Sequence, residues 1–406
     1  MTYGPVITEA RRAAELAART SYGRLIASLA SRSRDIVVAE DALSDAFAAA
    51  LATWPERGVP SSPEAWLLTA ARRNLNHRAR HQNVQLGAVA ELLSRIDEGA
   101  EVTDWVAVDE RLKILFVCAH PAIDENIRTP LMLQTVLGLD AQRIGSAFLV
   151  APSTMGQRLV RAKTKIKQAA LRFEVPDLRE APTRLDDVLR AVYVAYGSAW
   201  DDHAGGRGLA EEALYLGRTL VSLLPQEPEA RGLLALMLYC ESRREARRDA
   251  SGRFVPLPEQ DPRRWSTAMI IEAEALLTAA SQAGRFGRFQ CEAAIQSVHA
   301  QRGVTGHTEH AAICLLYELL LNHTPSVGVA VGRAAALIEA GALEDGARAL
   351  DALDPESVLL YQPYWVVRAR LAERRGDQEL MRSTLERALG LTEDAAVRRY
   401  LSDRLV

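Results

Sequence analysis

The stretch LDAQRIGSAFLVAPSTMGQRLVRAKTKIK, residues 139–167, carries the clearest pattern in a chain of 406 residues. We predict a short helix from Asp140 to Phe148, a tight turn from Leu149 to Pro152, and a second helix from Thr154 to Lys167. Ser153 is expected to cap the second helix, because its hydroxyl can accept hydrogen bonds from the free amides of the first turn. Two short helices joined by a tight turn are typical of a helix-turn-helix motif.

The second helix has an apolar face and a basic face. Its apolar side chains recur at helical spacing, and no acidic residue occurs from Ser153 to Lys167. In helix-turn-helix proteins the second helix enters the major groove, where arginines can bond guanine and lysines neutralise phosphates. Taken alone, these residues are explained equally well by a basic helix that only faces water. The DNA-contacting residues predicted on this helix are Ser153, Thr154, Gln157, Arg158, Arg161, Lys163, Lys165 and Lys167.

The composition of the chain favours helices throughout. Ala, Leu, Arg and Glu dominate, aromatic residues make up 6%, and β-branched runs are short, so we expect an all-α fold. The hydrophobic fraction of 48% and the charged fraction of 25% are those of a globular protein and argue against disorder. The formal net charge of −3 does not favour DNA binding, so the support for it is local to the basic helix.

An amphipathic helix is predicted from Ala39 to Ala52, with apolar residues on one face and acidic residues on the other. Prolines and a glycine between Trp54 and Pro63 predict a loop. Ser62 is placed to cap the next helix, with Pro63 at its first position. That helix is expected to end in a basic run that reaches Arg80.

The C-terminal half of the chain indicates helix upon helix, joined by turns that contain glycine, proline or aspartate. Two units resemble each other, because Gly341 and Gly376 each precede an acidic turn and an Ala/Leu-rich helix. Their separation is close to the roughly 34-residue tetratricopeptide period. Leu209 to Leu224 is a weaker third unit, so we expect a tetratricopeptide-like extension.

Two upstream segments add weight to the DNA-binding explanation. IVVAEDALSDAF at residues 36–47 resembles the helix with which sigma factors grip the clamp helices of RNA polymerase. AWLLTAARRN at residues 65–74 resembles the sigma helix that contacts the −10 promoter element, and the helix-turn-helix is similar to the region that reads the −35 element. The first 175 residues therefore resemble the extracytoplasmic-function sigma factors.

The resemblance continues into the extension. CAHP at residues 118–121, GLLALM at 232–237 and DASGR at 249–253 resemble one sigma subgroup with a tetratricopeptide-like C-terminal domain. Members of this subgroup are often encoded beside small YCII-related proteins. The domains that the resemblance implies are sigma region 2 at 1–80, a linker at 81–108, sigma region 4 at 109–175, and the helical extension at 185–406.

The resemblance implies a protein that binds core RNA polymerase and promoter DNA and is not an enzyme. The side chains expected against polymerase are Glu40, Asp41, Leu43, Asp45 and Phe47. Those expected at the −10 element are Arg57, Trp66, Arg72, Arg73, Asn76, Arg78 and Arg80, although Trp66 is better explained as a core residue. The extension is expected to dock on regions 2 and 4 with the help of Asp249, Arg253, Gln260 and Asp261.

Two other classes of function remain open. An enzyme would need a site, but the Asp201–His203 segment lacks a phosphate-binding lysine, and His307 and His310 lack a third ligand nearby, so no metal or cofactor is expected. A helical-repeat scaffold whose N-terminal helices bind protein instead of DNA is the other alternative. The absence of a secretory signal and of an apolar run of about 20 residues predicts a cytoplasmic protein without a membrane span. Four widely spaced cysteines are expected to be reduced.

Overall fold

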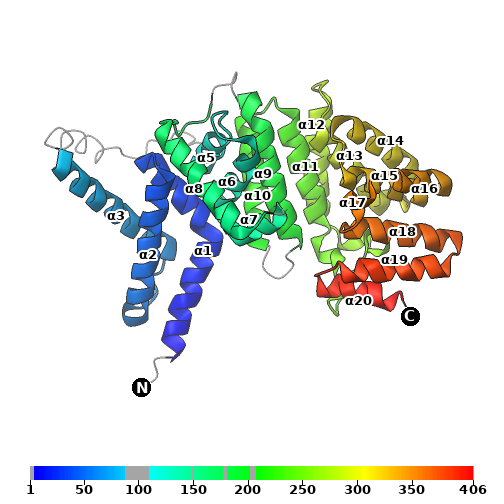
Figure 1. Cartoon of the computed structure of the whole chain (residues 1–406), viewed down its shortest axis with the longest axis horizontal. Helices are drawn as coiled ribbons and strands as arrows, with labels where there is room; N and C mark the ends of the chain where they lie inside the picture. The colour runs from blue at the N-terminus through cyan, green and yellow to red at the C-terminus, as the bar shows by residue number, and fades with distance from the viewer. Residues whose placement is uncertain (1–3, 87–108, 149, 177–180, 202–206, 406) are drawn as a thin grey trace. The chain divides into compact units, whose positions relative to one another are not determined.

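The computed structural model describes residues 4–86, 109–148, 150–176, 181–201 and 207–405. In this part of the chain the regular secondary structure is helical, apart from one isolated bridge between Arg248 and Phe254, and the predicted all-α fold is confirmed. The chain divides into two compact units, Met1–Thr219 and Leu220–Val406 (Figure 1). None of the described helices combines the length and the apolar character that a membrane crossing requires.

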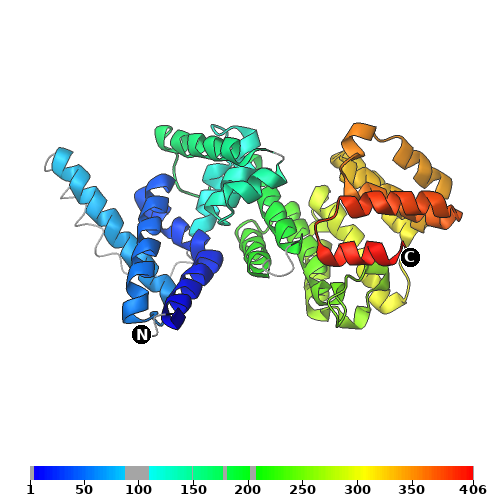
Figure 2. The same ribbon diagram turned by 60° about the horizontal axis from the view of Figure 1, so that its bottom comes forward.

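The first unit begins with three helices that contact one another, α1 (Gly4–Ser33), α2 (Ile36–Arg57) and α3 (Pro63–Leu86) (Figure 2). Each helix contributes a fully buried leucine to the core, namely Leu29, Leu43 and Leu67. Burying a leucine side chain stabilises a fold by roughly 1.5–3 kcal/mol, so this apolar contact holds the three helices together.

The end of α2 lies later than the sequence predicts. We expected a loop from Trp54 onward, but the helix continues through Pro55 to Arg57. Gly58 ends it, because its φ of 83° is a backbone conformation that residues other than glycine rarely adopt. The Gly58 N–H donates to the Trp54 carbonyl at 2.9 Å and so satisfies a terminal acceptor of the helix.

The start of α3 agrees with the sequence prediction, and its end does not. The helix begins at Pro63, whose missing N–H costs nothing at a first helical position. It runs to Leu86, so residues 81–86 of the predicted linker are helical. The rest of the predicted linker, residues 87–108, lies outside the described residues.

Four further helices follow in the first unit, α5 (Glu110–Cys118), α6 (Glu125–Thr135), α7 (Ala141–Ala147) and α8 (Pro152–Gln168). The helices α7 and α8 contact each other and lie where the sequence predicts the two helices of a helix-turn-helix. The predicted cap at Ser153 is wrong, because α8 begins at Pro152 with Ala151 as its N-cap and has no side-chain capping bond. A proline in the first turn supplies the helical φ angle and needs no partner for a backbone N–H.

The helices α9 (Ala181–Asp201) and α10 (Arg207–Leu223) come next, and α9 packs on α5 and α6. An ion pair supports this contact, because Arg128 of α6 binds Asp187 of α9 at 2.8 Å, and a second pair joins Arg111 of α5 to Glu212 of α10. The Arg111 side chain is 3% exposed and also lies over the Tyr215 ring. The start of the predicted extension therefore belongs to the first compact unit, and the unit boundary falls within α10.

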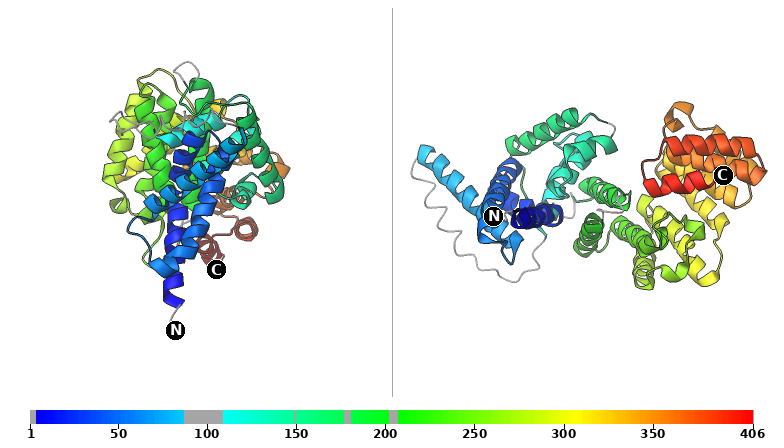
Figure 3. Two further views of the ribbon diagram at one scale, coloured as in Figure 1. Left: turned by 90° about the vertical axis from the view of Figure 1, so that its left-hand side faces the viewer. Right: turned by 90° about the horizontal axis from the view of Figure 1, so that it is seen from below.

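The second unit is built mainly from helices that are neighbours in sequence and pack in pairs, α11 with α12, α13 with α14, α15 with α16, and α18 with α19. This is the arrangement expected of a tetratricopeptide-like stack. Gly341 and Gly376, at the predicted repeat starts, have φ angles of 89° and 75° and precede α16 and α19. The C-terminal helices α18, α19 and α20 lie in sequence order side by side (Figure 3). The bounds are α11 Pro228–Ser242, α12 Thr267–Ser281, α13 Arg288–Thr305, α14 His310–His323, α15 Val327–Glu339, α16 Leu343–Asp351, α17 Pro355–Val358, α18 Gln362–Arg375, α19 Gln378–Gly390 and α20 Ala395–Asp403.

One carboxylate fixes the start of α13 on α11. Glu229 accepts hydrogen bonds from the backbone N–H groups of Phe289 at 2.9 Å and Gln290 at 3.1 Å. These amides belong to the first turn of α13, where free N–H groups and the helix dipole favour a negative charge. Gly232 allows the close approach, because a Cβ atom there would stand 2.7 Å from the Gln290 nitrogen.

Candidate nucleic-acid interface

The predicted division of α8 into two faces is largely confirmed. The apolar side chains Met155, Leu159 and Ile166 are buried, with at most 2% exposed. The predicted DNA-contacting residues that are exposed are Ser153, Thr154, Gln157, Arg158, Arg161, Lys165 and Lys167.

Lys163 is the exception on this helix, and its predicted place on the solvent face is wrong. Its side chain is 7% exposed, and its Nζ atom lies 2.6 and 2.7 Å from the two carboxylate oxygens of Glu40 on α2. Its position could have been found in the sequence, because it follows Leu159 by four residues and precedes Ile166 by three. Those spacings place it beside the apolar face.

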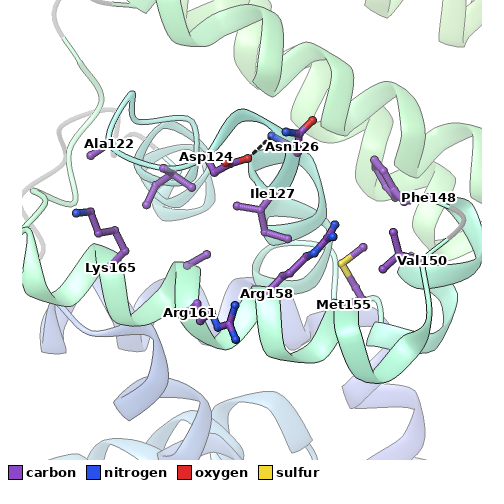
Figure 4. A pocket seen from close by; sticks show the side chains of 12 residues that line it. Ala122, Asp124, Asn126, Ile127, Phe148, Val150, Met155, Arg158, Arg161 and Lys165 are labelled. Carbon is purple, nitrogen blue, oxygen red and sulfur yellow. Dashed lines mark hydrogen bonds between the residues drawn. The ribbon is translucent and has the colours of Figure 1, made fainter.

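Three cations of α8 border a hollow of about 660 Å³. Figure 4 shows Lys165 reaching from α8 toward Ala122 in the turn between α5 and α6, and Arg158 reaching toward Ile127 of α6, with Arg161 between them on the helix. None of the three has an ion-pair partner among the described residues. Asp124, the one acid among the residues that line the hollow, accepts a hydrogen bond from the Asn126 N–H at 2.9 Å.

The floor of the hollow is apolar. Ile123, Ile127 and Met155 line it and are largely buried, and Phe148 and Val150 complete it from the end of α7 and the following turn. A rim on which three cations outnumber one acid attracts anions, and phosphodiester groups are the anions that a helix-turn-helix meets. The exposed face of α8 therefore has the electrostatic character of a nucleic-acid interface.

The residues predicted to contact polymerase lie in different environments. Asp41 and Asp45 are exposed and Phe47 is half-buried, as a contact surface requires. Leu43 is 0% exposed, so the prediction that it anchors a partner is wrong: it belongs to the core of the unit. Glu40 was expected to be exposed, but its side chain is 22% exposed and binds Lys163.

The residues predicted at the −10 element lie on α2 and α3. Arg57, Arg73 and Asn76 are exposed. Trp66 is half-buried, and its ring meets Trp54 edge-on at 5.5 Å between centroids, in line with the expectation that it packs in the core. Arg72 is exposed and donates a hydrogen bond to the Ser28 hydroxyl at 3.2 Å. Nothing is described of the Arg78 and Arg80 side chains, although both residues are helical.

The residues predicted to dock the extension lie in the segment that connects α11 to α12, and their side chains contact residues of that same segment. Asp249 accepts hydrogen bonds from the backbone N–H groups of Ser251 and Arg253, and the Ser251 hydroxyl bond is the first cause that lowers the pKa of this carboxyl group. Asp261 caps a short 3₁₀ turn, and the buried Gln260 donates to the Val255 carbonyl at 3.1 Å. The described contacts of these side chains are thus local, and docking stays a prediction.

The four cysteines are free thiols in the structure, with Cys118 and Cys291 buried. Burial raises the pKa of the Cys118 thiol to about 12, which disfavours a reactive thiolate. Its His120 neighbour accepts a hydrogen bond from the Ala122 N–H. These residues therefore have the environment of structural groups.

Known proteins that are similar to this chain have been found, but their descriptions name no activity. A model described as "Family of unknown function (DUF6596)" matches residues 184–281, from α9 to the end of α12. A protein of Rhizobium meliloti (strain 1021), described as "Uncharacterized protein R00370", is 35% identical over 384 residues. The match covers 92% of this chain and 90% of the relative. No solved structure matches the chain.

Proposed function

The chain belongs to the same family as the Rhizobium meliloti protein, and we propose that it is a sigma-type transcription initiation factor. In this proposal it binds core RNA polymerase through α2, holds the −10 element with α3 and reads the −35 element with α8. It acts in the cytoplasm and makes or breaks no covalent bond. The second unit is a fused regulatory domain.

The observation that carries the proposal is the row of Arg158, Arg161 and Lys165 along the second helix of a helix-turn-helix. They follow one another at intervals of three and four residues, so they project from neighbouring positions of one face. They have no ion-pair partner among the described residues, so their charge is available to DNA. The two arginines can each form a bidentate pair with guanine, whereas a lysine acts mainly on phosphate.

We propose a smaller set of polymerase-contacting residues than the sequence suggests. Asp41, Asp45 and Phe47 remain candidates, because they are exposed or half-buried on α2. Leu43 is left out because it is in the core. At the −10 element, Arg73 and Asn76 on α3 are exposed and suited to bind the backbone of a melted strand.

The test is reconstitution with core RNA polymerase. We expect the purified chain to copurify with the core enzyme and to direct transcription from a promoter that is mapped by sequencing the transcripts. Replacing Arg158 and Arg161 with alanine should abolish that transcription while leaving polymerase binding intact. Arg348→Ala, an exposed arginine of the second unit, is the matched control. A chain that binds neither core polymerase nor DNA contradicts the proposal.

The alternative function is a scaffold that binds protein partners without reading promoters. The paired helices of the second unit favour it, because such stacks present surfaces for protein partners. The two functions differ in what the first unit does. A scaffold predicts no salt-dependent retention of the chain on DNA or heparin, and no loss of function when Arg158 and Arg161 are replaced.

A further inference from the structure

Two acids at the start of α2 meet two lysines near the end of α8. Glu40 binds the Lys163 Nζ atom with both carboxylate oxygens, at 2.6 and 2.7 Å. Asp35 binds the Lys167 Nζ atom at 2.9 Å. The lysines are one helical turn apart, so the two bridges run along one edge of each helix. We call these four residues the α2–α8 clasp.

The Glu40–Lys163 half of the clasp is largely buried, whereas in the other half the Lys167 side chain is exposed. The exposed fractions are 7% for the Lys163 side chain, 22% for Glu40, 10% for Asp35 and 65% for Lys167. Asp35 has a second task, because its other oxygen accepts the backbone N–H groups of Val37 and Val38 at the start of α2. A buried charge that loses its partner is costly, so the buried Lys163 and Asp35 side chains each require the opposite charge that the clasp supplies.

The same unit also has a close contact between α1 and the end of α6. A Cβ atom on Gly23 of α1 would lie 1.7 Å from the Val136 carbonyl oxygen at the end of α6, so the two backbones touch. Gly138, just beyond α6, lies against the Tyr22 ring. Burial, and secondly the charge of the clasp residue Glu40, raises the pKa of Tyr22.

The clasp occupies the helices that the proposed function uses. In the proposed function α2 binds polymerase and α8 binds DNA. In the structure, however, two acids at the start of α2 form ion pairs with two lysines of α8. A lysine that already holds a carboxylate gains little from a phosphate, because the two anions compete for one ammonium group. Opening of the clasp would free both helices at once.

We propose that the acidic edge of α2, formed by Asp35 and Glu40, is the partner of Lys163 and Lys167 in the free chain, and that it competes with DNA for α8. The inference rests on the proposed function and adds an order of events. Polymerase binding at α2 separates the edge from α8, and the released lysines then join Arg158, Arg161 and Lys165 on the phosphates.

The test compares the full chain with its Asp35→Asn and Glu40→Gln double variant, which keeps side-chain shape and removes both negative charges. Hydrogen exchange should rise in α2 and in α8 of the double variant. Affinity for a random-sequence DNA duplex should rise roughly tenfold at low salt, and the slope of log K against log salt should steepen by about 0.9 for each released lysine. Glu56→Gln, an exposed acid at the other end of α2, is the matched control and should change neither measurement.

The charge-swapped variant, Glu40→Lys with Lys163→Glu, protects the test against simple damage to the fold. It re-forms the pair in the opposite sense, so it should restore wild-type exchange in both helices. Exchange that rises only in α2, or DNA affinity that is unchanged or falls in the neutral variant, overturns the proposal. The proposed function fails separately, when the wild-type chain with core polymerase binds no promoter DNA.

Discussion

The positive charge of α8 is divided between two environments. Arg158, Arg161 and Lys165 border the hollow, whereas Lys163 and Lys167 bind acids of α2. Asp35, through a hydrogen bond and its charge, raises the pKa of Lys167, so that ammonium group stays protonated beside its partner. The first three side chains can bind DNA without giving up an ion pair, and specific recognition is expected from the two arginines among them.

Replacing Arg158 or Arg161 with alanine should reduce affinity for a matched promoter by about 1–3 kcal/mol and reduce affinity for random DNA much less. Lys165→Ala should weaken binding to both DNAs alike and reduce the salt slope by about 0.9, because one phosphate contact is lost. Fluorescence anisotropy of the polymerase complex at several salt concentrations measures both effects. Equal losses on the two DNAs for all three variants would remove the base-reading role.

Charge reversal on α2 should distinguish Glu40, which stabilises the fold, from Asp41 and Asp45, which are expected to contact polymerase. Glu40→Lys places a second cation beside the buried Lys163 ammonium group, so we expect the free energy of unfolding to fall by about 3 kcal/mol. Reversal of Asp41 and Asp45 should change it by less than about 1 kcal/mol, since both are exposed, and should weaken polymerase binding. Urea unfolding and polymerase pull-down measure the two properties. A stable Glu40→Lys protein would contradict the buried pair.

The helices α2 and α8 show that local sequence predicts where a helix lies better than where it begins and ends. Periodicity located both helices, because apolar residues at helical spacing must face a core. It failed at their ends: Gly58 terminates α2 where Pro55 does not, and Pro152 starts α8 without a cap from Ser153. Proline tolerates the last and first turns of a helix, so a proline alone does not mark the boundary.

The contact between α11 and α13 gives a prediction for an element. Glu229→Gln keeps the shape of the side chain but removes the negative charge at the α13 N-terminus. We expect a loss of about 1–3 kcal/mol in the free energy of unfolding of the second unit, because hydrogen bonds to a charged group are lost. Chemical unfolding followed by circular dichroism measures it. Glu379→Gln, in the exposed first turn of α19, is the control and should be neutral.

The organisation of the whole molecule depends on contacts that local sequence does not show. Arg128 pairs with a residue 59 positions away and Arg111 with one 101 positions away, so neither partner follows from helical spacing. The prolines around residues 176–182 suggested a domain boundary, but α9 returns to cover α5 and α6. The all-α fold and the helix-turn-helix were predictable from pattern, whereas the unit boundary and the clasp required tertiary structure.

The position of a truncation should therefore decide what it does. A chain that ends near Val175 loses Asp187, the acid that pairs with Arg128, and Glu212, one of the two acids that pair with the buried Arg111, which keeps Asp109. Breaking a buried ion pair costs about 3–5 kcal/mol, so this truncation should unfold at much lower denaturant or aggregate. A chain that ends after α10, at Gln226, retains both pairs and should unfold cooperatively, as urea denaturation can show.

Transcription assays of the two truncated chains then distinguish damage to the first unit from loss of regulation by the second. Loss of activity in the shorter chain reports damage to α5 and α6, because those helices carry Arg111 and Arg128, whose partners on α9 and α10 are removed. A change of activity in the longer chain reports regulation by the second unit, which is the docking prediction in testable form. If both truncations unfold at the same denaturant concentration, α9 and α10 do not support the first unit, and the boundary belongs near Val175 as the sequence suggested.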